Sequence, residues 1–284
     1  MGIFTDIRPS PIAGLWYEGH PDSLRAAVDA YLDQAKIPAL EGEVVGIIAP
    51  HAGHRYSGAV AGYAFAAVRG RSYPLVAVIS PMHHPYFQPL LTSAHQAYAT
   101  PLGTIPIDEV ALAELDEALK RRLGYGLSAV RNDPEHSLEI ELPFLQRALN
   151  APFSLLPVMV RAVQPQVSQS LGEALAEVLQ GRQALLIAST DLSHYYDQQT
   201  ALALDRAMLE QFEKFSPEGA FEVEAQEKGY ACGLGAVTAV LWAARARGAN
   251  RVRVLYHATS GDITGDYSQV VGYAAAVILK VAEA

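Results

Sequence analysis

The sequence contains a single cysteine, Cys232, among its 284 residues. A lone cysteine cannot form an internal disulfide, so the sequence gives no sign of a disulfide-stabilised secreted protein. The N-terminal segment lacks the basic start and the apolar core that a signal peptide has. We therefore expect a cytoplasmic protein.

Long apolar runs and excess positive charge are also missing. The apolar stretches are too short, or too often interrupted by glycine, to span a bilayer, which takes about 20 residues. Lys and Arg number 21 against 30 Asp and Glu, and the formal net charge is −9. Because a nucleic-acid groove needs clustered cations, we expect no nucleic acid as a partner. Because no apolar run is long enough, we expect no membrane as a partner either.

Hydrophobic residues, in contrast, make up 50% of the chain, which is enough for a sizeable core. No low-complexity tract or flexible linker marks a domain boundary. We therefore expect one α/β domain over residues 1–284.

Six short apolar runs are typical of buried strands. Their residues do not alternate in polarity, which favours strands that are covered on both faces. The runs are Val44–Ala49, Leu75–Ser80, Leu155–Val160, Ala184–Ser189, Val252–Tyr256 and Val270–Leu279.

The segments between these runs have helical periodicity. The predicted helices are Tyr56–Val68, Asp108–Arg121, a helix opened by Asp133 and Pro134 that Pro143 should kink or split, Gln166–Leu179, Gln198–Phe215 and Gly233–Arg247. Alternating strands and helices predict a mainly parallel central sheet that is covered by helices on both faces.

Histidines follow three of the predicted strands. His51 comes after the first run, His83 after the second and His194 after the fourth. Ligands bind beyond the carboxyl ends of strands in open α/β sheets, and imidazole is the commonest metal ligand in proteins. One histidine after a strand is more often structural, but three such turns favour a shared metal pocket. His54 and His84 are second members of their turns, and we expect one histidine of each pair to pack away from the pocket.

Asp191, three residues before His194, has two compatible interpretations. It is either a pocket carboxylate that orients an imidazole or binds metal, or the N-cap of a following helix. Glu135 and His136 also have two interpretations. They border the pocket as acid/base groups or an anion site, or they cap a helix, and the residues alone favour capping.

Cys232 lies between small residues at the start of a predicted helix. The helix dipole favours the thiolate there, which would make Cys232 a metal ligand or a reactive thiol. The alternative is a small buried apolar residue, as most free cysteines are. The residues leave these two readings open.

The same segments resemble the Memo family. The matching motifs run in order over essentially the whole chain, and together they are specific. They are AGLWY at 13–17, PHAG at 50–53, SPMHH at 80–84, DPEHSLEIELPFL at 133–145, STDLSHY at 189–195, ACG at 231–233 and DYSQVVGYAA at 266–275.

This resemblance implies a fold like that of the class III extradiol dioxygenases, which bind non-haem Fe(II) through two histidines and a carboxylate. By the same resemblance His51, His83 and Cys232 would be the metal ligands. His194 would be the acid/base group, with Asp191 beside it.

Glu135 and His136 would also border that pocket. The family further implies an AmmeMemoRadiSam system, with an AMMECR1-like protein and a radical SAM protein as partners.

The third ligand departs from the dioxygenase pattern because it is a thiolate. Thiolate favours softer ions such as copper or zinc, and it is open to oxidation beside an oxygen-activating iron. We expect Fe(II) first, with copper or zinc as alternatives. The first functional hypothesis is a metal-dependent redox enzyme acting on a small substrate. The second is a non-catalytic metal-binding or interaction protein whose pocket holds a peptide or partner segment. A zinc hydrolase is a weaker third.

Overall fold

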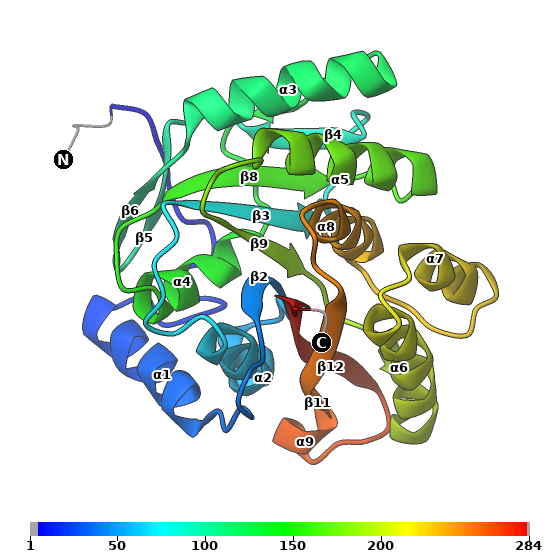
Figure 1. The fold of residues 1–284 in the computed structure, drawn as a ribbon. Coiled ribbons are helices and arrows are strands. Elements are labelled where there is room, and N and C mark those ends of the chain that lie inside the picture. The colour runs from blue at the N-terminus through cyan, green and yellow to red at the C-terminus, as the bar shows by residue number, and fades with distance from the viewer. Residues whose placement is uncertain (1–4, 283–284) are drawn as a thin grey trace.

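A mixed sheet of nine strands runs through residues 5–282, the part of the chain that the computed structural model describes (Figure 1). Met1–Phe4 and Glu283–Ala284 of the expected domain lie outside the described residues. In sheet order the strands are β10 (His194–Tyr196), β12 (Val270–Lys280), β2 (Glu43–Ala49), β9 (Ala184–Ser189), β3 (Leu75–Pro81), β8 (Ser154–Val160), β4 (Leu90–Ser93) and β7 (Ser128–Val130), while β11 (Arg251–Thr259) also pairs with β12.

The four central strands β2, β9, β3 and β8 are parallel to one another. The predicted α/β fold with a parallel core is therefore confirmed. The flanks differ, because β12 runs antiparallel to β2 and to β11, and β4 runs antiparallel to β8. An apolar run has the same composition in a parallel and in an antiparallel strand, so the sequence pattern could not predict the direction of these flanking strands.

Helices cover both faces of the sheet (Figure 1). One face packs against α1 (Pro21–Gln34), α2 (His54–Ala66) and α4 (Leu142–Ala148), and the other against α3 (Glu109–Leu123), α5 (Pro165–Val178), α6 (Gln198–Glu213) and α8 (Leu234–Ala246). The shorter helices are the 3-10 turn η1 (Glu139–Glu141), α7 (Pro217–Ala225) and α9 (Gly261–Thr264). None of the described helices is long and apolar enough to cross a membrane.

The sheet separates two apolar cores, and successive strand residues contribute to one and then to the other. In β12, Ala274 and Ala276 pack with the helices of one face, whereas Ala275 and Val277 pack with those of the other. Both sets are buried, which explains why the strand runs show no alternation of polarity. Burial of apolar surface on both faces is the main driving force for this arrangement.

The predicted helix opened by Asp133 is wrong. Asp133 instead accepts hydrogen bonds from the guanidinium of Arg8, so its carboxylate does not cap a helix. The helix begins later, at Leu142, and Pro143 lies in its first turn, where the missing N–H costs nothing. The other five predicted helices are confirmed, with ends that differ by at most two residues.

Arg8 lies on β1 (Ile7–Arg8), which forms a small second sheet with β5 (Ala97–Thr100) and β6 (Gly103–Pro106). Its side chain is 1% exposed and also bonds Glu139 Oε2 at 2.5 Å. Two carboxylates from the loop around η1 therefore converge on one buried cation. This contact fixes the 133–139 segment, which also carries Glu135 and His136.

Candidate metal centre

Three imidazoles meet at one edge of the sheet. His51, His83 and His136 each offer a ring nitrogen, and these atoms lie within 4.8 Å of one another. His51 follows β2 and His83 follows β3, and both strands are parallel to β9 between them. Their carboxyl ends therefore share one edge, as expected for His51 and His83, whereas His194, the third predicted histidine, is not in this group. His136 joins the group from the loop before η1.

The ring of His51 is anchored through its Nδ1 atom. Nδ1 lies 2.9 Å from Ser189 Oγ, and the side of the ring that carries Nε2 faces Cys232 Sγ at 3.1 Å. The residue is 2% exposed. Burial, and then the neighbouring His83, lower the pKa of His51 well below its ordinary value. The imidazole is therefore neutral, as a metal ligand must be.

Glu135 holds His83 at two points. Oε1 lies 2.9 Å from Nδ1 of His83, and Oε2 accepts the backbone N–H of the same residue at 2.6 Å. Burial alone would raise the pKa of Glu135, but the hydrogen bond from His83 brings it well below its ordinary value. A carboxylate on Nδ1 leaves Nε2 free to bind a metal.

The same carboxylate also caps the following turn. Glu135 Oε1 accepts the backbone N–H groups of His136 at 3.0 Å and Ser137 at 2.9 Å. The prediction that Glu135 caps a helix is wrong, because no helix begins at this turn: η1 starts at Glu139 and has no side-chain cap. The carboxylate oxygens of Glu135 that bind this turn also bind His83, so Glu135 lies beside the histidine cluster.

His136 stacks between two rings. Its ring centroid lies 4.0 Å from that of Trp16 and 4.7 Å from that of His83. Burial lowers the pKa of His136 to about 4, so it too is neutral. We expected His136 as an acid/base group, and the structure places it where it could bind a metal. Trp16, which is 37% exposed, belongs to the AGLWY motif, but its contact with this cluster was not predicted from the sequence.

Cys232 lies two residues before α8 and is not one of the three residues whose ligand atoms converge, but its Sγ contacts His51 of that group. Its Sγ accepts the backbone N–H of Asp191 at 3.2 Å and lies 3.1 Å from Nε2 of His51. Burial, and then the Asp191 carboxylate, raise the pKa of the thiol. The neutral thiol is therefore favoured, and not the thiolate that we expected at this position. A bound metal ion would reverse this balance.

Glycine at position 233 makes this approach sterically feasible. A Cβ atom there would lie 2.2 Å from the backbone oxygen of Ser189, at the end of β9. Real Cβ atoms do not come this close to a backbone atom. Gly233 therefore lets the first turn of α8 pack against the end of β9 and brings Cys232 beside His51.

Asp191 lies on the loop after β9, and His194 is the first residue of β10. Asp191 Oδ1 accepts the backbone N–H of His51 at 2.8 Å, and burial raises the pKa of this carboxyl to about 7. The N-cap of α6 is Asp197, so the alternative role of Asp191 as a helix cap is wrong. His194 donates from Nδ1 to the backbone oxygen of Leu192 at 2.8 Å. Burial, and further the charge of His83, lower the pKa of His194.

His54 packs away from the centre, as one member of its pair was expected to do. It is buried beside Tyr17 and Phe144, and its Nε2 lies 3.2 Å from the backbone oxygen of Ile140. Burial lowers the pKa of His54 to about 4.

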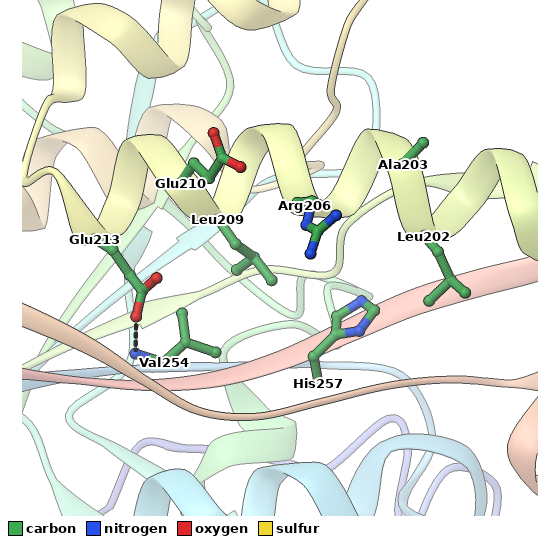
Figure 2. Close-up of a pocket in the computed structure, with 8 residues that line it drawn as sticks. All are labelled: Leu202, Ala203, Arg206, Leu209, Glu210, Glu213, Val254 and His257. Atoms are coloured by element: carbon green, nitrogen blue, oxygen red, sulfur yellow. Dashed lines mark hydrogen bonds between the residues drawn. The ribbon is translucent and has the colours of Figure 1, made fainter.

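A groove of about 800 Å³ lies elsewhere, between α6 and β11 (Figure 2). Figure 2 shows His257 of β11 facing α6, and Glu213 accepting the backbone N–H of Val254 at 3.1 Å. The residues that line this groove include none of the histidine cluster. It is therefore a different part of the surface.

These features define an α/β protein whose parallel strands carry a histidine cluster suited to a metal ion. The chain belongs to the Memo family, because the family model described as Memo-like protein matches residues 8–277. The sequence resemblance is thereby confirmed.

Relatives match over nearly the full chain. A MEMO1 family protein of Thermotoga neapolitana is 37% identical over 283 residues, which cover 96% of this chain and 99% of that protein. One of Methanopyrus kandleri is 34% identical over 286 residues, with 96% and 99% covered. One of Nitrosopumilus maritimus is 30% identical over 274 residues, with 95% and 98% covered.

Proposed function

We propose that the protein binds one transition-metal ion through His51, His83 and Cys232, with His136 directly beside it. The observation that carries this proposal is the anchoring of the two histidines. Nδ1 of His51 is tied to Ser189 and Nδ1 of His83 to Glu135, which leaves both Nε2 atoms for a metal. Metal-binding histidines usually have such a partner on the second ring nitrogen.

The donor set fits a metal of borderline softness. Two imidazoles and one thiolate suit iron, copper and zinc better than magnesium or calcium. We favour Fe(II), because the fold resembles that of the non-haem iron dioxygenases, and keep copper and zinc as alternatives. When bound, the ion would supply Lewis acidity and, for iron or copper, redox chemistry.

We further propose that the centre serves a redox enzyme that acts on a small substrate. The side chain of His83 is 33% exposed, so the centre has a solvent-facing side, as catalytic metal sites do. Asp191 and His194 would hold and move protons. The pKa of Asp191, raised to about 7, lies where a group can both give and take a proton.

A non-catalytic role has its own supporting observation. Trp16 stacks on His136 and is partly exposed, and Tyr195 beside His194 is largely exposed. Exposed aromatic side chains at a pocket are typical of peptide and protein interfaces. A peptide, an AMMECR1-like protein or a radical SAM protein as the occupant stays a prediction of the family resemblance.

Cobalt titration of the metal-free protein tests the ligand set. Co(II) bound by a thiolate gives an intense sulfur-to-metal charge-transfer band, and Cys232→Ser should abolish that band while leaving weaker cobalt binding. His136→Ala should retain the band. A band that survives in Cys232→Ser would exclude Cys232 as a ligand, and loss of all binding in His136→Ala would place His136 among the ligands.

Oxygen uptake separates the two functions. Protein loaded with Fe(II) should consume oxygen in the presence of catechol-like substrates, and His194→Gln should slow this reaction without changing iron content. Stoichiometric iron with no oxygen uptake for any substrate would favour the non-catalytic role.

A further inference from the structure

The hydroxyl group of Ser189 has three partners behind the metal centre. Ser189 is completely buried at the end of β9. Its Oγ lies 2.9 Å from Nδ1 of His51, 2.8 Å from the backbone oxygen of Ser137 and 2.6 Å from Oε1 of Glu141. All three are hydrogen-bond distances.

A serine hydroxyl has one proton to donate and two lone pairs with which to accept. The backbone oxygen of Ser137 can only accept, so the Ser189 proton must point to it if that contact is a hydrogen bond. The other two partners must then be donors. His51 donates from Nδ1, and Glu141 donates from a protonated carboxyl group. If the Ser189 proton is not shared between two acceptors, no other assignment makes all three contacts hydrogen bonds.

The surroundings of Glu141 suit a neutral acid. The residue is 0% exposed, and its Oε2 has no hydrogen-bond partner among residues 5–282. Burial raises the pKa of Glu141 well above its ordinary value, and the nearby Asp191 carboxylate raises it further, although the contact with Ser189 acts in the opposite direction. Glu139, two residues earlier, differs because the buried cation Arg8 pairs with it.

We propose that Glu141 is a positioning residue for His51: as a neutral carboxylic acid it donates to Ser189 and leaves Ser189 to accept the Nδ1–H of His51. The importance of this arrangement for metal binding rests on the function proposed above. The arrangement itself is a property of the metal-free protein.

The consequence lies on the other side of the ring. A proton on Nδ1 leaves a lone pair on Nε2, which faces Cys232 Sγ at 3.1 Å. In the metal-free protein the protonated thiol donates to this lone pair. The same lone pair is what a metal ion needs from His51, so Glu141 and Ser189 prepare the ligand without touching the metal.

Infrared and NMR spectra of the metal-free protein test the proposal directly. The wild type at neutral pH should show the C=O stretch of a protonated carboxyl group that Glu141→Gln lacks. Two-dimensional ¹⁵N spectra of the imidazoles, with His51 assigned through His51→Gln, should show the Nδ1–H tautomer. The absence of that infrared band, or an Nε2–H tautomer in the wild type, would overturn the proposal.

Variants then separate the role of the donor from that of charge. The amide of Glu141→Gln donates to Ser189 as the acid does, so it should bind Co(II) within about 3-fold of the wild type. Glu141→Met and Ser189→Ala should each bind about 10-fold or more weakly, as expected for the loss of a residue that orients a ligand. If Glu141→Gln binds as weakly as Glu141→Met, Glu141 acts as an anion and the proposal fails.

Ser168→Ala is the matched control. Ser168 is a buried serine of α5 whose hydroxyl has no hydrogen-bond partner among the described residues. It should leave both the tautomer of His51 and the affinity for Co(II) unchanged. If Glu141→Met does not fold, the spectra of the wild type and Glu141→Gln still decide. If the wild type binds no metal, the function fails while the two spectra continue to test the inference.

Discussion

One carboxylate, that of Glu135, holds both the ring and the backbone of His83. Oε1 lies 2.9 Å from Nδ1 of the ring, and Oε2 lies 2.6 Å from the backbone nitrogen. The turn after β3 and the direction of the imidazole are therefore set by a residue more than 50 positions away in the chain.

Glu135→Gln should weaken metal binding by about 10- to 100-fold, because a neutral amide cannot accept from both the ring and the backbone N–H of His83. Isothermal titration of the metal-free protein with Co(II) measures this change. Glu117→Gln, at an exposed position of α3, is the control and should bind as the wild type does. Equal affinity of the two variants would show that Glu135 does not orient the ligand.

Arg8→Met should lower the free energy of unfolding by about 3–5 kcal/mol, because it leaves the carboxylates of Asp133 and Glu139 buried without a cation. Chemical denaturation measures the loss. Arg25→Met, which breaks an exposed pair with Asp22, should cost at most about 1 kcal/mol. A loss for Arg8→Met as small as that for Arg25→Met would refute the account of this network.

The sequence predicted those parts of the fold that local pattern controls. The apolar runs located the six longest strands of the sheet, and the histidines after two of them were correctly expected to meet. Parallel neighbouring strands have their carboxyl ends at the same edge of the sheet. Residues that directly follow such strands could therefore be predicted to lie close together. Only the family resemblance predicted that Cys232 lies beside His51, because no local sequence pattern connects the two residues.

The segment around Asp133 could not be predicted in this way. An aspartate followed by proline looks like a helix start, but here its partner is Arg8, more than 120 residues earlier in the sequence. The double contact of Glu135 with His83 and the contact between Glu141 and Ser189 are also tertiary. Such pairs depend on which loops the sheet brings together, and the hydrophobic periodicity of the sequence cannot predict them.

His54 should make stability depend on pH. Its pKa is about 4 in the folded protein and 6.5 in the unfolded chain, so between these values the unfolded state binds more protons. The free energy of unfolding should therefore fall as the pH drops from about 6.5 to 4, with a contribution from His54 of up to about 3 kcal/mol.

Denaturation of the wild type and His54→Gln across this pH range measures that contribution. The glutamine can still donate to the backbone oxygen of Ile140, but it does not titrate. The difference in free energy between the two proteins should shrink or change sign toward pH 4. A difference that stays constant with pH would mean that His54 does not titrate as its burial requires.

The central claim is that His51, His83 and Cys232 hold a metal ion. Elemental analysis of protein purified without a metal-affinity tag, for the wild type and for His83→Ala, tests this claim most directly. We predict about one iron, copper or zinc ion per chain in the wild type and a loss of most of it in His83→Ala. Equal metal content in both proteins, or none in the wild type after growth with each metal, would contradict the account.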